Sequence, residues 1–485
     1  MTNGGPLIFL EYFQLERDMT SVEAETARTK IAIIGGGIGG LTLALALSRR
    51  DCSLIEVDLY ESASQLTERG AGITIWHRTW DILSGLGMEQ DMKALLPYDR
   101  SDEPTLTFQF RKGDQAKGFG FHELITNGGP INFHRVDFKQ AILRNIPESM
   151  KKSFHLSRSL VSYSECPDKV DLVFSDGSTA SCDILIGADG IKSSVRRDFL
   201  TQLAGGHHSV NEAQTERYAE GIEPVWSGGV AYRGFAPLEV LEQAMPNHRA
   251  AKRPTQYWGK DKHVVAYPIS QSQGRKLVNV IAQCSDMSKE GTAFEGPWVT
   301  EVTTENVARL FSGWDPEVTV LFNCFESASR WAIHTVKPLE AYVSRRVALL
   351  GDSAHAMTPN QGAGAGQAIE DAYILASLIT APGPTTQLSA PVIAQILETY
   401  DSIRRPAATR VQAASRAQGL VYDFNSPGFE GVDLVAEGDE RTSPERLKAL
   451  AEELIEKWKW LWTSSAEVDC ERAVAELQSC ILKLK

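Results

Sequence analysis

The feature that most constrains this chain is a glycine cluster between a short apolar run and a helical run. Residues 30–34 (Lys-Ile-Ala-Ile-Ile) are apolar and end at glycines, which is typical of a buried strand. Gly35, Gly37 and Gly40 follow with the spacing G-x-G-x-x-G, and a helical pattern comes next. A second apolar strand over residues 54–60 completes a β-α-β unit, whose two strands are expected to be parallel.

Each glycine of this cluster has a physical role in binding a dinucleotide. Gly35 permits a tight turn, Gly37 lets the backbone approach a pyrophosphate, and Gly40 lets helix and strand pack closely. The helix N-terminus adds free N–H groups and a partial positive charge for the phosphates. Glu61 follows the second strand, 21 residues after Gly40, where an acidic side chain can hydrogen-bond a ribose hydroxyl. The segment therefore predicts a dinucleotide site; a glycine cluster that serves only packing is the alternative.

Two later segments repeat the layout of a buried strand followed by an aspartate at a tight turn. The first segment, residues 182–196, contains Asp189, and the second, residues 346–355, contains Asp352. An aspartate just past a buried strand lies at the edge of an α/β sheet where ligands bind. A glycine-rich loop over residues 359–366 follows Asp352. Such a loop can bring backbone N–H groups against a flat heteroaromatic ring and begin a helix there.

These three fingerprints, in this order and spacing, resemble those of the single-component FAD-dependent aromatic hydroxylases, of the para-hydroxybenzoate and salicylate hydroxylase type. The resemblance covers residues 30 to about 425 and is strongest to the fungal salicylate-hydroxylase-like monooxygenases. It implies an α/β fold, with a Rossmann-like FAD-binding domain, an inserted β-sheet substrate domain and C-terminal helices. It also implies FAD as the cofactor and NAD(P)H as the co-substrate.

The resemblance implies cofactor contacts for residues of all three fingerprints and of the region between them. On the ADP half of FAD these residues are Gly35, Gly37, Gly40 and Glu61. On the flavin half they are Gly72, Arg135, Asp352 and Ala365, with Asp352 on the ribityl chain and Ala365 under the ring. Asp189 and Arg196 would serve both FAD and the passing nicotinamide.

Because the fingerprints are spread along the chain, the FAD-binding domain is expected to be discontinuous. Its expected parts are residues 30–100, 130–205 and 335–380, and the substrate-binding β-sheet domain takes residues 101–129 and 206–334. An N-terminal extension is expected over residues 1–29 and a C-terminal helical region over residues 392–485.

Local patterns give further expectations for the secondary structure. The substrate block is expected to contain strands over residues 229–235, 263–269, 277–282 and 319–322. Residues 205–225 are polar and are expected to form a loop. The C-terminal run Trp458-Lys-Trp460-Leu-Trp462 is expected to be a helix that packs its aromatic face on the body of the protein.

Oxygen transfer to an aromatic ring is faster for a phenolate than for a phenol, so the site needs a group that favours the anion. Arg233 and Tyr267 lie on expected strands and resemble the arginine/tyrosine pair of fungal hydroxylases that act on phenolic polyketides. In those enzymes the arginine holds the phenolate and the tyrosine orients the ring; a guanidinium stays charged at all working pH values. The alternatives are a salt bridge for Arg233 and a core position for Tyr267.

His334 is the third candidate on the substrate side. It precedes the last expected strand, and a histidine can take the phenol proton near neutral pH. A structural histidine is the alternative.

The composition indicates which classes of binding partner and which compartment to expect. With 49 basic and 62 acidic residues the formal net charge is −13, which disfavours nucleic acid and an anionic membrane surface. Seven cysteines without a C-x-x-C pair predict no metal site and fit a reducing compartment. The most apolar stretch has only 17 residues with five glycines, at the lower limit of a transmembrane span. We therefore expect a soluble cytoplasmic protein without a transmembrane segment.

The resemblance implies a FAD-dependent monooxygenase that uses NAD(P)H and O2 to hydroxylate a small phenolic or aromatic-acid substrate. NAD(P)H would reduce FAD, O2 would add at flavin C4a, and the hydroperoxide would deliver one oxygen to the ring. Three alternatives stay open. They are decarboxylative hydroxylation by a salicylate 1-monooxygenase, epoxidation of a non-aromatic substrate, and a flavin-binding sensor without turnover.

Overall fold

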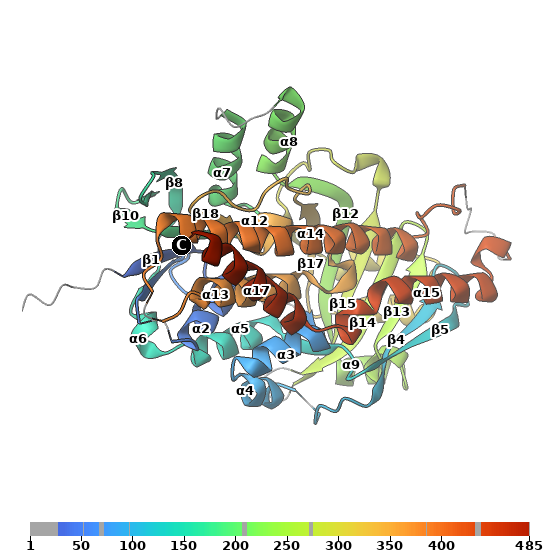
Figure 1. The fold of residues 1–485 in the computed structure, drawn as a ribbon. Helices are drawn as coiled ribbons and strands as arrows, with labels where there is room; N and C mark the ends of the chain where they lie inside the picture. Colours follow the sequence, from blue (N-terminus) through green and yellow to red (C-terminus); the bar gives the residue numbers. More distant parts are fainter. Residues whose placement is uncertain are drawn as a thin grey trace, which may run out of the picture.

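The computed structural model describes residues 28–51, 53–66, 72–96, 98–205, 211–270, 275–384, 386–431 and 438–484. The expected N-terminal extension therefore lies almost wholly outside the described residues. The rest forms a parallel sheet with its helices beside a larger β-sheet, and the long helix α14 (Ala390–Tyr422) extends past both (Figure 1).

The parallel sheet confirms the α/β fold that the glycine motif predicts. It has five strands in the order β18-β11-β1-β2-β7, and every neighbouring pair is parallel. The strands are β1 (Thr29–Ile34), β2 (Ile55–Tyr60), β7 (Phe154–His155), β11 (Ile184–Gly187) and β18 (Val347–Leu349). Helices α2 (Ile38–Ser48) and α13 (Gly364–Thr380) pack on each other beside this sheet. The central strand β1 is apolar on both faces because helices or strands cover both.

The second sheet joins two distant parts of the chain. Its eight strands follow the order β16-β17-β12-β15-β14-β13-β4-β5. The strands are β4 (Pro104–Lys112), β5 (Phe119–Asn127), β12 (Val225–Pro237), β13 (Thr255–Gly259), β14 (Lys262–Ser270), β15 (Lys276–Ser285), β16 (Val299–Val302) and β17 (Ala328–Thr335). Strand β4 pairs in parallel with β13, so residues near 110 and near 257 share one sheet.

Two smaller sheets complete the β-structure. One pairs β3 (Gly72–Ile75) with β6 (Ile131–His134), and the other contains β8 (Leu160–Glu165), β9 (Val170–Phe174) and β10 (Thr179–Cys182).

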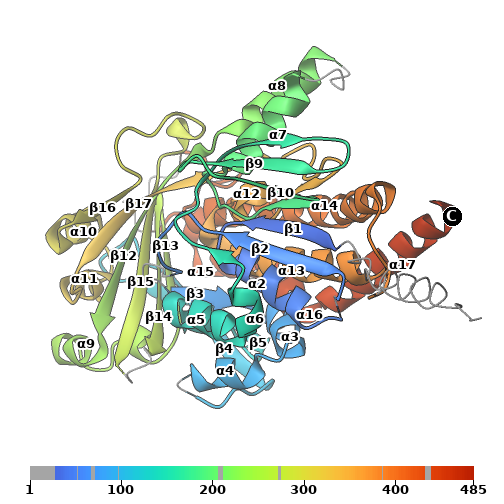
Figure 2. The same cartoon turned by 90° about the vertical axis from the view of Figure 1, so that its left-hand side faces the viewer.

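Helices cover the outer face of the eight-stranded sheet. Figure 2 shows α9 (Leu238–Ala244), α10 (Thr304–Leu310) and α11 (Pro316–Asn323) on the outside of the eight-stranded sheet. Their apolar side chains join the core of that sheet. The other helices are α3 (His77–Gly85), α4 (Glu89–Ala94), α5 (Arg135–Asn145), α6 (Glu148–Lys151), α7 (Ser194–Gly205), α8 (Glu212–Ile222), α12 (Asp352–His355), α15 (Pro444–Trp458), α16 (Trp460–Thr463) and α17 (Ala466–Leu484). Among the described residues, no helix is both long and apolar enough to cross a bilayer.

The tryptophan run packs on the body, as the sequence predicts. Trp458 ends α15 and is almost fully buried, with its ring centroid 5.1 Å from that of Trp76. Trp462 lies 5.3 Å from the same Trp76 ring, and Phe108 of the eight-stranded sheet stacks on Trp458 at 6.3 Å. These contacts attach α15 to the eight-stranded sheet through Phe108 and to the segment after β3 through Trp76.

Two local predictions are wrong. Residues 319–322 form part of helix α11 rather than a strand, because Asp315 caps the helix by accepting from the Glu317 N–H at 3.0 Å. Pro316 then occupies the first helical turn, where proline is well tolerated. The expected loop over residues 205–225 instead contains helix α8, which Asn211 caps through the Gln214 N–H.

Candidate active site

One cavity of about 750 Å³ runs between the parallel sheet and the eight-stranded sheet. Its wall at one end includes Gly37 and Glu61, which follow strands of the parallel sheet. At the other end it includes Arg233 of β12 and Tyr267 of β14. The cavity therefore joins the predicted dinucleotide site to the predicted substrate site.

The glycine turn leaves room for a ligand on one side and packs tightly on the other. A Cβ on Gly37 would meet no atom within 4 Å, so the backbone there is open to the cavity. A Cβ on Gly40 would collide with the Gly35 carbonyl oxygen, so only glycine allows α2 to approach β1 this closely. The first turn of α2 carries no acidic residue, which leaves its N-terminus suited to phosphate.

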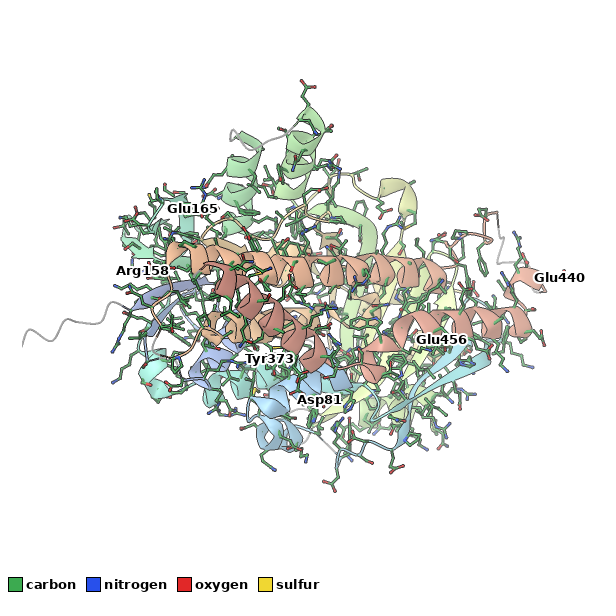
Figure 3. All side chains as sticks on the ribbon, viewed as in Figure 1. Asp81, Arg158, Glu165, Tyr373, Glu440 and Glu456 are labelled. Atoms are coloured by element: carbon green, nitrogen blue, oxygen red, sulfur yellow. The ribbon has the colours of Figure 1, made fainter. Side chains whose placement is uncertain are left out.

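Glu61 is fixed at the end of β2. Its Oε2 accepts from the Gly36 N–H and its Oε1 from the Ala63 N–H, both at 2.8 Å. Arg158 lines the same end of the cavity, and its backbone N–H donates to the Glu61 carbonyl at 2.8 Å. Figure 3 shows Arg158 beside the small β8–β10 sheet, at the opposite end of the molecule from Glu440. The Glu61 carboxylate is thus held where it could also accept a ribose hydroxyl.

Asp189 and Arg196 lie around one turn, but their side chains are engaged within the protein. The Asp189 carboxylate accepts from the Ser193 hydroxyl at 2.5 Å and from the Ser194 N–H at 2.8 Å, at the start of α7. Burial raises the pKa of Asp189, and these hydrogen bonds oppose that rise. The Arg196 guanidinium donates to the carbonyls of Ile191, Ile222 and Ser353. Asp189 lines the cavity, whereas Arg196 lies behind it.

Asp352 and Ala365 reach the cavity from the loops after β18. Asp352 begins the short helix α12, directly after Gly351, whose φ of 67° suits glycine. Ala365 lies in the first turn of α13, so the N-terminal end of that helix forms part of the cavity wall. Asp352 and Ala365 could therefore contact the middle and the ring end of an extended cofactor.

Gly72, Arg135 and Tyr267 meet on the substrate side. A Cβ on Gly72 would lie 2.7 Å from the Tyr267 hydroxyl, so strand β3 passes directly over that group. Arg135 begins α5, and Lys139 follows one turn later; both line the cavity. The cavity therefore carries two cations on α5 in addition to Arg233.

Arg233 is a deeply placed cation that faces the cavity. The strand register pairs it with Ile281 of β15, which also lines the cavity. Its guanidinium carbon lies 5.0 Å from the Trp331 ring centroid, and its Nε has no hydrogen-bond partner. Burial and Arg135 lower the pKa of Arg233, whereas Tyr267 raises it. No carboxylate of the described residues affects the pKa of Arg233. A negatively charged group of a ligand could therefore pair with this guanidinium.

Tyr267 is buried beside Arg233. Burial raises the pKa of its hydroxyl, and Thr74, Arg233 and Asn279 lower it. The net rise keeps the hydroxyl protonated at neutral pH, so Tyr267 can donate a hydrogen bond into the cavity.

The structure does not bring His334 to this site. His334 lies on β17, is not among the residues that line the cavity, and stacks on Trp298 with ring centroids 3.6 Å apart. Its Nδ1 lies 3.0 Å from the Ala332 carbonyl, and burial lowers its pKa. This setting suits a neutral structural histidine, the alternative that the sequence left open.

Sequence reasoning missed several residues of the wall. Lys139 carried a usable signal, because it follows Arg135 by four residues on the same helix face. The other missed residues, which include Thr74, Arg158, Ile281 and Met357, belong to ordinary strand or loop sequence without a motif.

Comparisons with known proteins agree with this geometry. The family model described as "FAD binding domain" matches residues 28–415. The salicylate hydroxylase of Pseudomonas putida is 33% identical over 459 residues, covering 92% of this chain and 95% of that protein. The 6-methylsalicylate 1-monooxygenase of Aspergillus terreus is 31% identical over 417 residues, covering 83% of this chain and 85% of that protein. A solved salicylate hydroxylase substrate complex has a TM-score of 0.74 at 32% identity, covering 92% of this chain and 98% of the other.

Proposed function

Because the chain belongs to the FAD-binding-domain family and is a FAD-dependent monooxygenase of the salicylate hydroxylase type, we propose that it hydroxylates a phenolic aromatic acid held by Arg233 and Tyr267. NAD(P)H and O2 are its co-substrates. The relatives named for salicylate and 6-methylsalicylate support an aromatic acid with a neighbouring hydroxyl as the substrate class.

The observation that carries this proposal is the setting of Arg233. Removing a cation from water is costly unless an opposite charge meets it. Arg233 is influenced by Tyr267 and Arg135 but by no carboxylate of the described residues, and its Nε is unpartnered. A carboxylate or phenolate on the substrate supplies the missing charge and accepts the free N–H.

The cavity fits FAD as the cofactor. The open backbone at Gly37, the fixed Glu61 carboxylate and Asp352 at the turn after β18 lie along one continuous wall. We assign the ADP half to Gly35, Gly37, Gly40 and Glu61, and the flavin half to Gly72, Arg135, Asp352 and Ala365. FAD, when bound, accepts a hydride from NAD(P)H and activates O2 for transfer to the ring.

The chain's own residues bind and orient the substrate. Arg233 attracts the substrate anion and favours the phenolate over the phenol, because its charge persists at all working pH values. Tyr267 stays protonated and donates a hydrogen bond that fixes the ring. Ile281, Met357 and Pro359 add wall on this side of the cavity, where they help to exclude water.

Asp189 lines the cavity and Arg196 does not, but the side chains of both make hydrogen bonds within the protein. Both side chains are used within the protein, so we propose that they hold the turn past which the nicotinamide enters. We assign His334 no part in proton transfer and expect His334→Gln to retain coupled turnover.

The experiment that tests the proposed function compares substrate classes. NAD(P)H oxidation is measured with salicylate, with phenols that lack a carboxylate, and with alkenes, and the products are identified by mass. We expect phenolic acids to accelerate NAD(P)H oxidation and to gain one oxygen. A product that loses its carboxyl group as CO2 assigns decarboxylative hydroxylation, and an epoxide assigns the rival chemistry. NAD(P)H oxidation that no substrate accelerates, with no oxygenated product, would contradict the proposal and favour a flavin-binding sensor.

A further inference from the structure

A cluster of buried charges lies behind the cavity, between helices α3, α13 and α14. Arg404 of α14 donates from Nε to Asp371 Oδ1 at 2.7 Å and from Nη1 to Glu370 Oε2 at 3.0 Å. Arg78 of α3 donates from Nε to Glu370 Oε1 at 2.9 Å. These four side chains are at most 6% exposed, and none of them lines the cavity. The cluster is therefore not part of the site described above.

The neighbouring His355 also contacts this cluster through Asp371. Its Nε2 lies 2.6 Å from Asp371 Oδ2, whereas its Nδ1 is buried without a partner. The ionised Asp371 carboxylate can only accept, so His355 donates to it from Nε2. The two arginines balance Glu370 and Asp371, and Arg78 also pairs with Asp469, which is 30% exposed, at 2.5 Å.

Asp371 also reaches the loop that leads to the cavity. Its Oδ2 accepts from the Gly351 N–H at 2.9 Å. Gly351 has a φ of 67° and is followed by Asp352 on the cavity wall. Two further hydrogen bonds hold the same turn. The Ser353 hydroxyl donates to the Gly187 carbonyl at 2.5 Å, and Arg196 donates to the Ser353 carbonyl at 3.0 Å. The turn is thus fixed from three directions.

We propose that Asp371 is a positioning residue for the cofactor, because its carboxylate fixes the Gly351 N–H and thereby sets where Asp352 meets the ribityl chain of FAD. Arg404 and His355 hold this carboxylate in place, and Glu370 balances the charge of Arg404. A turn fixed before binding spares the cofactor the free-energy cost of ordering it. The inference rests on the FAD contacts of the proposed function and is independent of the substrate.

The chain offers a matched control for this role. Asp423 at the end of α14 is also a buried carboxylate beside a histidine, with His263 Nδ1 at 2.6 Å and the Ser285 hydroxyl at 2.6 Å. It joins α14 to strands β14 and β15 and does not line the cavity. Variants of Asp371 and of Asp423 should therefore lose comparable stability, but only the former should lose cofactor.

The test uses Asp371→Asn and Asp371→Glu beside Asp423→Asn and Asp423→Glu. Each protein is purified with FAD and diluted, and the released FAD is measured by fluorescence together with the unfolding temperature. We expect the FAD dissociation constant to rise about 10-fold or more in both Asp371 variants, the size of a lost hydrogen bond to a charged group. The visible spectrum of the flavin at saturating FAD should also change, whereas the Asp423 variants should keep both values.

Asp371→Glu decides the outcome if Asp371→Asn does not fold, because it keeps the negative charge and only displaces the carboxylate. Two results would overturn the inference. One is an unfolding temperature as low as that of the Asp423 control with FAD affinity and spectrum unchanged; the other is equal loss of FAD in the Asp423 variants. Since FAD binding is measured without turnover, an enzyme that binds FAD normally but oxygenates nothing contradicts the proposed function alone.

Discussion

Arg233 and Tyr267 lie on strands β12 and β14, which both pair with β15 between them. The register pairs Arg233 with Ile281 and Tyr267 with Asn279, two positions further along. Both side chains thus line one face of the sheet. The Arg233 guanidinium keeps its charge although burial lowers its pKa, and burial keeps the Tyr267 hydroxyl protonated. We therefore propose that these two side chains orient the substrate.

Removing either group should separate cofactor binding from oxygen transfer. Arg233→Ala and Tyr267→Phe are expected to retain FAD, because neither residue lies at the ADP end of the cavity. Both should lose coupling, so that NAD(P)H is consumed with release of hydrogen peroxide instead of product. The measurement is product formed per NAD(P)H oxidised; unchanged coupling in both variants would move the substrate site elsewhere.

Asp352→Ala tests the cofactor assignment at the same scale. The substitution removes the carboxylate at the turn after β18 without disturbing the buried contacts of Gly351 and Ser353. We expect folded protein that is purified with little FAD. A variant as yellow and as active as the parent enzyme would contradict the role of Asp352.

Asp371 gives a pH dependence of stability. Its pKa is lowered from the ordinary 3.8 to about 2, because the nearby His355 and Arg404 outweigh the effect of burial. A depressed carboxyl pKa contributes stability above the unfolded value and loses it as the pH falls through the folded value. The shift corresponds to about 2 kcal/mol, present above about pH 4 and lost toward pH 2. Urea unfolding between pH 7 and pH 2 measures this contribution to the free energy of unfolding. If the parent protein and Asp371→Asn differed in unfolding free energy by the same amount at every pH, the contribution would be contradicted.

Helix α13 shows how one element serves cofactor and core together. Its first turn carries Ala365 at the cavity, and its next turns carry Glu370 and Asp371 into the buried charge cluster. The element was predictable, because a buried strand, a glycine-rich loop and an apolar helical pattern are local signals. The partners of Asp371 were not, since Gly351 and Arg404 meet it only after α12 and α14 have packed.

The C-terminal helices depend on an aromatic contact at the scale of elements. Trp458 packs against both Trp76 and Phe108, so it joins α15 to the segment after β3 and to the eight-stranded sheet. Trp458→Ala should cost about 3–5 kcal/mol of unfolding free energy, as for other large buried aromatic side chains. Thermal unfolding measures the loss, with Trp460→Ala as a control at a less buried ring. Equal effects of the two substitutions would contradict this role.

The glycine turns and parallel strands were predictable because their signals are local, but the pairing within the larger sheet was not. Strand β4 pairs with β13 across more than a hundred intervening residues, and no local pattern specifies that partner. The incorrect prediction of a strand over residues 319–322 has a related cause. The apolar residues of this segment do pack against a sheet, but they belong to a helix that begins at Pro316 after the Asp315 cap. A histidine is chemically able to take the phenol proton, so the sequence made His334 a candidate. Its stacking on Trp298 depends on the fold and carries no local signal.

At the scale of the whole molecule, the parallel sheet and the eight-stranded sheet lie beside each other (Figure 2), and residues from both line the cavity. Its cofactor end follows strands of the parallel sheet and its substrate end lies on the eight-stranded sheet, so neither sheet forms the site alone. We therefore propose the discontinuous FAD-binding domain and the inserted substrate domain, with the boundaries given above, as the functional division of the chain. The acidic net charge of −13 belongs to the chain as a whole, whereas Arg135, Lys139 and Arg233 make the cavity locally basic.

We propose that this protein transfers one oxygen atom from O2 to an aromatic acid held at Arg233. The most direct measurement supplies isotopically heavy O2, NAD(P)H and salicylate to the FAD-loaded enzyme and weighs the product. We expect the parent enzyme to give a hydroxylated product that carries one heavy oxygen per NAD(P)H oxidised, and Arg233→Ala to give hydrogen peroxide in its place. Heavy oxygen that appears only in hydrogen peroxide or water, for every phenolic acid offered to the parent enzyme, would contradict it.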